Sequence, residues 1–451
     1  MTSSLASSWP TVYLNDLIVD IQPGFASGKH NSTGEGIPHF RPMNITKDGI
    51  IDRSVLKFVS PSAGRPEIRL RRGDVVFNNT NSPELVGKTA LFVDSDTPAF
   101  SNHMTRLRVE ESRLDPGFLA LRLHQLWREG WFAAHCNNHV SQASIGRSVL
   151  RSIEIELPPL EIQIAIRSLA TKIDVERSSY MRHFLAAQRS IEQFRQAVLA
   201  AACSGRLTED WRKANPVQQH VKVAVGELTR SRCGNITGAE PDDLELPELA
   251  DNFVVTTVGR AAISVDYGTS KKATSLESGV PVLRMGNIQN GRLDTRELKY
   301  CPDSQEMDRL IVEDGDLLFN RTNSPELVGK SAVFRESKRM TFASYLIRVR
   351  IDREMAVPEF VSFWINSTWG RLWARRVKTD GVSQSNINGT KLRAMPIPLP
   401  PLDEQREIVR RVTRALDIAD MTLSKLNSSL RRIDRSSQAV LAKAFRGELV
   451  A

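Results

Sequence analysis

The strongest constraint on the fold of this chain is an internal repeat at one fixed distance. Residues 73–92 read GDVVFNNTNSPELVGKTALF and residues 315–334 read GDLLFNRTNSPELVGKSAVF, with 15 of 20 positions identical and an offset of 315 − 73 = 242. The same offset relates residues 140–142 to 382–384, 157–160 to 399–402 and 196–200 to 438–442. A two-fold repeat predicts two similar structural units, and hence two similar sites on one partner or one site on each of two partners.

Length and composition place the chain among globular proteins of two to four domains. It has 451 residues, of which 41% are hydrophobic and 25% charged. No apolar run has the length of a membrane span and no secretory signal is visible at the N-terminus, so we expect a cytoplasmic protein without a membrane partner. The net charge of +9 favours a polyanionic partner. The four cysteines share no metal-type spacing and are expected to be reduced.

Each half of the sequence has a mixed section followed by one long helix. The mixed section contains short apolar stretches bounded by turn residues, which are typical of strands, and segments such as 116–131 that are typical of helices. Each long helix is predicted to begin after a Pro-Pro pair, 158–159 or 400–401, and to end near Gly205 or Gly447. The predicted fold class is α/β (α+β), with two globular domains separated by two long helices.

An apolar stripe at helical spacing runs along both long helices. It comprises Ile162, Ile166, Leu169, Ile173, Phe184, Ala187, Ile191, Phe194 and Val198 in the first, and Ile408, Val412, Leu416, Ala419, Leu423, Leu426, Leu430 and Ile433 in the second. Four-three spacing indicates a coiled-coil seam, so the helices are predicted to pair as an antiparallel coiled coil about 65 Å long. The alternative is that each helix packs on its own globular domain. The predicted parts are residues 1–156, 157–207, 208–398 (including a linker around residues 239–243) and 399–451.

Several motifs of catalysis are absent or broken. Gly87-Lys88-Thr89 and Gly329-Lys330-Ser331 resemble the end of a phosphate-binding loop, but serine stands where its first glycine is required, at Ser82 and Ser324. Residues 135–139 (HCNNH) correspond to 377–381 (VKTDG), which contain no ligand set for a metal. We therefore predict no catalytic residue, metal or cofactor. An enzyme with an unrecognised site of Asn, Ser and Lys is the alternative.

Short amide and hydroxyl side chains in the repeated motif are candidates for contacts with bases and phosphates. The same side chains also build turns by bonding their own backbone, which is an equally good interpretation. Lysine and arginine nearby are candidates for phosphate contacts. The predicted DNA-binding residues are Arg41, Asn44, Asn78, Asn79, Thr80, Asn81 and Lys88 in the first half, and Arg284, Asn287, Asn320, Arg321, Thr322, Asn323 and Lys330 in the second.

The chain resembles the specificity (S) subunits of type I restriction–modification systems. The resemblance rests on the helix start at residues 399–405 (LPPLDEQ), on 382–387 (VSQSNI) and on both TNSPELVGK stretches, and it covers nearly the whole chain. The first copy departs from it at 161–163 (EIQ) and at Ala143-Ser144. The resemblance implies two target-recognition domains that each bind one half of a bipartite double-stranded DNA site, and paired helices that set the spacer.

The resemblance also implies partners. Two methyltransferase (M) subunits would bind around the helices and use S-adenosylmethionine, and restriction/motor (R) subunits would join them, while the S subunit carries neither cofactor nor chemistry. A scaffold that joins two similar proteins without binding DNA is the alternative. Matching positions of the repeat are expected to build the scaffold or to bind the same M subunit twice, and divergent ones, such as 26–39 against 268–282, to recognise bases. Asn79 against Arg321 is the sharpest mismatch, since asparagine suits adenine and arginine suits guanine.

Overall fold

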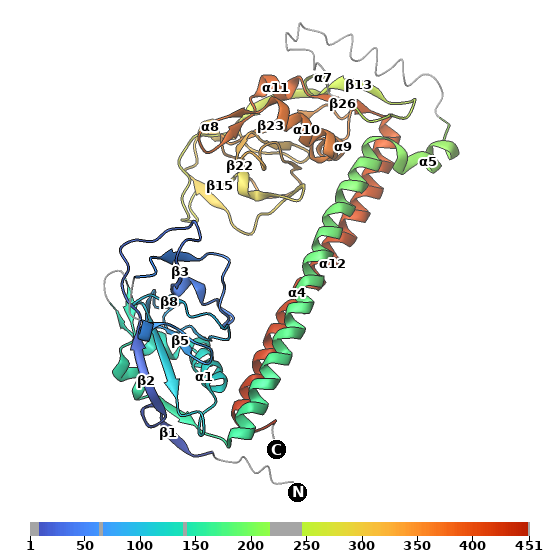
Figure 1. Ribbon diagram of the computed structural model, residues 1–451. Helices are drawn as coiled ribbons and strands as arrows, with labels where there is room; N and C mark the ends of the chain where they lie inside the picture. The colour runs from blue at the N-terminus through green and yellow to red at the C-terminus, as the bar shows by residue number, and fades with distance from the viewer. Residues whose placement is uncertain (1–8, 63–65, 139–141, 217–245, 450–451) are drawn as a thin grey trace. The chain divides into compact units, whose positions relative to one another are not determined.

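The chain folds into two compact units. The computed structural model describes residues 9–62, 66–138, 142–216 and 246–449. Unit 1 comprises residues 1–183 with 428–451, and unit 2 comprises 184–427. Each unit combines a mixed helix-and-strand domain with one half of each of two long helices (Figure 1). The predicted α/β fold class is thereby confirmed, whereas the predicted linker around residues 239–243 lies outside the described residues and the predicted domain boundaries stay a proposal.

The domain of unit 1 is built on a four-stranded antiparallel sheet in the order β2-β9-β5-β7. Its strands and helices are β1 (Thr11–Tyr13), β2 (Ile18–Pro23), β3 (Ile37–Phe40), β4 (Lys57–Val59), β5 (Val75–Asn78), β6 (Thr80–Asn81), β7 (Thr89–Leu91), β8 (Ala99–Phe100), β9 (Met104–Val109), α1 (Pro116–Arg128), α2 (Trp131–His135), β10 (Asn137–Asn138), β11 (Ala143–Ser144), α3 (Arg147–Arg151), β12 (Glu154–Glu156) and α4 (Leu160–Cys203). Short 3₁₀ turns include η2 (Pro42–Asn44).

Both faces of this sheet are covered, which explains why β5 is a continuous apolar run instead of an alternating one. Side chains alternate across a strand, so Val75 and Phe77 face one way and Val76 the other. Val75 and Phe77 belong to the cluster that contains Phe118 of α1. Val76 belongs to a second cluster with Phe40 of β3. The repeated motif thus forms the central strand of the domain.

Unit 2 repeats this order of elements. It contains β13 (Val254–Thr257), α7 (Val258–Ala261), β14 (Ala262–Tyr267), β15 (Val280–Leu283), η5 (Met285–Asn287), β16 (Ile288–Gln289), β17 (Arg292–Leu293), β18 (Lys299–Cys301), α8 (Gln305–Asp308), β19 (Leu317–Asn320), β20 (Thr322–Asn323), β21 (Ser331–Val333), β22 (Thr341–Phe342), β23 (Leu346–Ile351), α9 (Pro358–Asn366), α10 (Thr368–Val377), β24 (Thr379–Asp380), β25 (Ser385–Asn386), α11 (Gly389–Arg393), β26 (Pro396–Leu399) and the N-terminal part of α12 (Leu402–Phe445). Its main sheet has the order β14-β23-β19-β21, equivalent strand for strand to that of unit 1.

The two long helices keep the repeat distance and pair within each unit. Both have 44 residues, and their starts differ by 402 − 160 = 242. In unit 1, Arg177 of α4 bonds Asp434 of α12, and in unit 2 Arg195 bonds Asp420, so residue numbers rise along one helix as they fall along the other. The helices therefore run antiparallel in both units, side by side in Figure 1.

One member of the predicted apolar stripe is wrong. Phe194 is 45% exposed, whereas its neighbour Arg195 is buried between the helices. The guanidinium of Arg195 lies 2.5 Å from the carboxylate of Asp420, and this ion pair compensates for the burial of its charge. The other residues of the predicted stripe are buried or half-buried, and Phe184 and Leu416 are among the buried ones.

A buried glutamine joins each long helix to its domain and explains the Pro-Pro-Leu-x-x-Gln spacing. Gln163 accepts a hydrogen bond from the backbone N–H of Asp115 (2.8 Å) and donates to the carbonyls of Arg113 (2.9 Å) and Pro158 (2.8 Å). Gln405, 242 residues later, makes the equivalent three bonds to Val357, Met355 and Pro400. Each junction fixes the helix start against the loop that precedes α1 or α9.

A search of the described residues for a helix both long and apolar enough to cross a membrane finds none.

Replacing Gln163 by leucine is expected to lower the free energy of unfolding of unit 1 by about 2 kcal/mol, because three buried backbone groups lose their partner. Gln196→Leu is the matched control, since Gln196 lies on the same helix and its side chain donates only to Glu192. Urea unfolding of both variants measures the difference. Equal unfolding midpoints for the two variants would contradict the structural role of the junction.

Candidate nucleic-acid interface

The end of the repeated motif forms a tight turn, as expected from its serine and proline. In unit 1 the carbonyl of Ser82 accepts from the N–H groups of Leu85 (3.0 Å) and Val86 (2.9 Å). Gly87 follows at φ +96°, and a Cβ atom there would lie 2.4 Å from the ring of Phe132. Only glycine fits a left-handed position this close to a side chain. Gly87-Lys88-Thr89 therefore serves the turn of the chain.

The first asparagine of each repeated motif, Asn78 or Asn320, is fully buried. Asn78 and Asn320 are both 0% exposed. The amide of Asn78 donates to the carbonyl of Leu85 (2.9 Å). Neither amide atom of Asn320 has a hydrogen-bond partner among the described residues. In this conformation neither side chain is accessible to a ligand, and the predicted DNA contact of both residues stays a prediction.

A second pair of predicted residues stabilises the 3₁₀ turns η2 and η5. The amide oxygen of Asn44 accepts from the N–H of Arg41 (2.9 Å), and its nitrogen donates to the carbonyls of Asp52 and Val55. Asn287 makes the equivalent bonds with Arg284, Asp294 and Glu297. Both asparagines are buried, while Arg41 and Arg284 are half-buried. Of these four residues, the two arginines retain partly exposed side chains.

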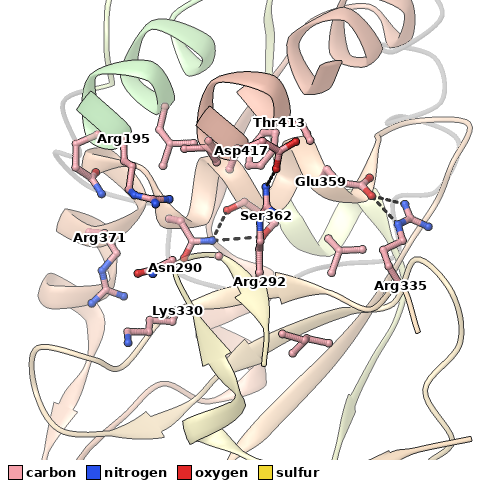
Figure 2. A pocket seen from close by; sticks show the side chains of 18 of the residues that line it. Arg195, Asn290, Arg292, Lys330, Arg335, Glu359, Ser362, Arg371, Thr413 and Asp417 are labelled. Atoms are coloured by element: carbon pink, nitrogen blue, oxygen red, sulfur yellow. Dashed lines mark hydrogen bonds and ion pairs between the residues drawn. The ribbon is translucent and has the colours of Figure 1, made fainter. Parts of the chain in front are cut away.

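The two motif lysines have different surroundings. Lys88 is 5% exposed and its ammonium donates to the carbonyls of Pro42 (3.2 Å) and Ile45. Burial, followed by repulsion from Lys47, lowers the pKa of Lys88 below its usual range. Lys330 is half-buried and lines a cavity of about 650 Å³ (Figure 2). Burial and the neighbouring Arg371 lower the pKa of Lys330.

The Thr-Asn dipeptides of the motif lie at the edge of two small antiparallel sheets. Strand β6 (Thr80–Asn81) pairs with β11, which pairs with β10. Strand β20 (Thr322–Asn323) pairs in the same way with β25 and β24. All four side chains are half-buried. Asn81 and Asn323 each accept from the N–H of the following serine, at 2.9 and 2.8 Å, so part of their hydrogen-bonding capacity serves the turn.

The mismatch between Asn79 and Arg321 is accompanied by changes around it. Asn79 donates to the carbonyl of Asn102 and to the hydroxyl of Thr105. Arg321 donates to the carbonyl of Ser344 (3.3 Å) and to the side chain of Asn386 (3.1 Å), and its guanidinium carbon lies 4.9 Å from the ring centre of Tyr267. Both residues therefore support neighbouring strands from within the domain, and their role in base recognition stays a prediction.

The hairpins β10–β11 and β24–β25 bring further polar residues to the motif that the sequence argument did not select. Asn137 and Asn138 on β10 are exposed, as are Thr379 and Asp380 on β24. All four paired positions of these hairpins differ between the repeats, whereas Thr-Asn of β6 and β20 is identical. The sequence feature that could have identified these hairpin residues is their divergence on either side of the matching residues 140–142 and 382–384.

The divergent segments named from the sequence, 26–39 and 268–282, also differ in structure. His30 and His39 lie 3.1 Å apart between Nε2 and Nδ1, and burial followed by His30 lowers the pKa of His39 to about 4. Their counterparts in unit 2 are Ala273 and Val282, at an offset of 243 (282 − 39). Among the described residues no group of three or more His, Cys, Asp or Glu side chains could hold a metal ion.

The sequence is similar to those of known proteins over most of its length. Residues 268–430 match the family model of the type I restriction modification DNA specificity domain. The chain is 28% identical over 430 residues to the EcoKI specificity subunit of Escherichia coli K12, covering 92% of this chain and 83% of that one. It is 26% identical over 426 residues to the StySPI specificity subunit of Salmonella potsdam, with the same coverage of both chains.

Solved structures share the fold. A chain from a structural study of complex assembly and conformational transition of the type I R-M system superposes with a TM-score of 0.65 at 19% identity, covering 98% of this chain and 99% of that one. The HsdS subunit from Thermoanaerobacter tengcongensis gives a TM-score of 0.50 at 19% identity, covering 98% of both chains. Residues 268–430 thus contain a type I restriction modification DNA specificity domain, and over most of its length the chain is similar in sequence and fold to type I specificity subunits.

Proposed function

We propose that this chain is the DNA-recognition subunit of a type I restriction–modification complex, and that each unit recognises one half of a bipartite site. The observation that carries this proposal is the pattern of divergence at the motif. Identical residues build the turns and the glutamine helix junctions, and the central strands β5 (VVFN) and β19 (LLFN) differ only by exchange of one apolar residue for another, whereas all four paired positions of the β10–β11 and β24–β25 hairpins differ. A protein with one scaffold and two different half-sites requires this distribution.

The exposed hairpin residues have the chemistry of base recognition. Asn137 and Asn138 present amides, which suit adenine, while Thr379 and Asp380 present a hydroxyl and a carboxylate, and a carboxylate can accept from the amino group of cytosine. Asp380 is held by Lys378 and the hydroxyl of Ser385, and these hydrogen bonds lower the pKa of its carboxyl. Asn79 and Arg321 then distinguish the half-sites by supporting these sheets from within each domain.

The proposal includes partners and assigns the chemistry to them. Two methyltransferase subunits bind around the paired helices, restriction/motor subunits join the assembly, and this chain is itself non-catalytic. The relatives are named as specificity subunits, which supports this division of labour. A scaffold that ignores DNA lacks a comparable observation in its favour.

The exchange of the exposed hairpin residues tests the assignment of the reading elements. Replacing Asn137–Asn138 by Thr-Asp and Thr379–Asp380 by Asn-Asn is expected to alter the preferred bases in both half-sites at an unchanged spacer. Thr89→Ser with Ser331→Thr is the matched control, because these two residues also diverge between repeats but are 0% exposed. Mapping of methylated adenines in complexes with the methyltransferase partner gives the result. Unchanged target sequences in the hairpin variant would remove these residues from base recognition.

Shortening the paired helices tests whether they set the spacer. The numbers of facing residues sum to 611 (177 + 434) and 615 (195 + 420) in the two ion pairs between the helices. Residues 181–187 and 425–431, whose ends sum to 612, therefore face each other and are deleted together. One heptad removes roughly 10 Å, which corresponds to about three base pairs of B-DNA. The preferred spacer in methylation mapping should shorten by that amount. An unchanged spacer in an intact complex would contradict the role of the helices.

Salt dependence separates DNA recognition from the scaffold alternative. Binding that releases counterions from phosphates weakens steeply as salt rises, by roughly 10³-fold or more between 50 and 200 mM for six or more phosphate contacts. Fluorescence anisotropy with labelled duplex at several salt concentrations measures this slope for the assembled complex. A flat dependence would favour a protein that joins its partners without contacting DNA.

A further inference from the structure

Each unit contains an ion-pair network that links one loop of its domain to both long helices. In unit 1 the loop after η2 carries Asp48, whose carboxylate lies 2.7 Å from the guanidinium of Arg177 on α4 and 3.6 Å from that of Arg128. Arg177 in turn lies 2.8 Å from the carboxylate of Asp434 on α12. Arg177 thus joins the loop to both helices. We name Asp48, Arg128, Arg177 and Asp434 together the unit 1 latch.

Unit 2 has a network at the equivalent loop. Arg292, at the start of β17, lies 2.5 Å from the carboxylate of Asp417 and 3.7 Å from that of Asp420, both on α12. Asp420 also lies 2.5 Å from the guanidinium of Arg195 on α4. Figure 2 shows Arg292 reaching Asp417 beside the cavity that the loop and the helices line. Arg292, Asp417, Asp420 and Arg195 form the unit 2 latch.

The two latches occupy the same place in the repeat with opposite charge. The loop after the 3₁₀ turn is one residue shorter in unit 2, so the positive-φ glycines Gly49 and Gly291 (both φ +75°) correspond, Asp48 corresponds to Asn290, and Ile50 corresponds to Arg292. The loop contact with the helices is therefore made by a carboxylate, Asp48, in unit 1 and by a guanidinium, Arg292, in unit 2. On the helices, Asp417 corresponds to Val175 and Asp420 to Ser178 at the offset of 242. No residue of one latch is conserved in the other, so duplication of the sequence does not account for their shared position.

The inversion distinguishes the two halves where the helix junctions do not. Gln163 and Gln405 make equivalent backbone bonds in the two units, so these contacts alone do not select one half of the helix pair. The wrong combination would place Asp48 against Asp417 and Asp420, or Arg292 against Arg177. Like charges at such distances repel, and repulsion of the wrong partner is an effective source of specificity.

We propose that the latches are positioning elements that hold each domain on its own stretch of the helix pair and thereby fix the gap between the half-sites. This inference rests on the proposed DNA-recognition function. The charges are only partly buried, with side-chain exposure of 27% for Arg177 and 48% for Arg292, so each ion pair is individually weak. Loss of such weak contacts is expected to change the distribution of domain positions without unfolding the domain.

Charge reversal in the complex with the methyltransferase subunits tests the latch. The substrates are DNA duplexes that carry the native half-sites at the native gap and at gaps one base pair shorter or longer. Arg292→Glu is expected to raise methylation at the altered gaps about fivefold or more relative to the native gap, with the half-site sequences unchanged. Adding Asp417→Arg restores an ion pair of reversed sign and should return the gap profile to within about twofold of wild type.

Two further variants keep the test decisive. Arg296→Glu is the control, because Arg296 lies four residues after Arg292, beyond β17, and among the described residues its hydrogen bonds and ion pair are with Asp294; its gap profile should match wild type. If Arg292→Glu prevents assembly, Arg292→Gln replaces it, with a smaller expected rise at the altered gaps. A wild-type complex that methylates no bipartite site refutes the proposed function. A wild-type complex that does, together with variants of unchanged gap profile or a double variant without recovery, overturns the latch proposal alone.

Discussion

The antiparallel pairing of α4 with α12 is the interaction on which the rest of the structure depends. Each unit uses one half of both helices, and in unit 2 Leu199 of α4 and Val412 of α12 belong to the same buried cluster. The C-terminal end of α12 completes the core of unit 1, where Phe445 lies 5.4 Å from Phe118 between ring centres. The end of α4 completes the core of unit 2 through Leu199 and Cys203. In each unit, residues far apart in the sequence therefore share a core.

The sequence predicted the parts of the fold that local chemistry determines. Pro-Pro pairs and the glycines at 205 and 447 bracket helices that begin at Leu160 and Leu402, and the repeat offset fixed the equivalence of the two units. The apolar stripe was wrong at Phe194, because hydrophobicity alone could not show that an ion pair with Asp420 allows Arg195 to take the buried position.

The sequence predicted the residues of the candidate site less completely than it predicted the fold. Amide side chains have the same composition whether they bind bases or their own backbone. In the structure Asn44 and Asn78 are buried and bond backbone carbonyls of nearby turns, and their contact with bases stays a prediction. Strands β10 and β11 have two residues each, too few for a periodic pattern, and β11 pairs with β6 from about sixty residues earlier. Latch residues such as Asp48 and Arg292 do not match across the repeat, so the offset could not identify them.

Selection of DNA from a random pool tests the central claim most directly, namely that two similar domains on paired helices recognise two different half-sites at one gap. The wild-type chain, assembled with methyltransferase subunits, is incubated with random-sequence duplex, and the retained DNA is sequenced. We predict two short conserved blocks of different sequence separated by a fixed number of unconserved base pairs. One uninterrupted block, two blocks at variable separation, or no enriched sequence would contradict this account.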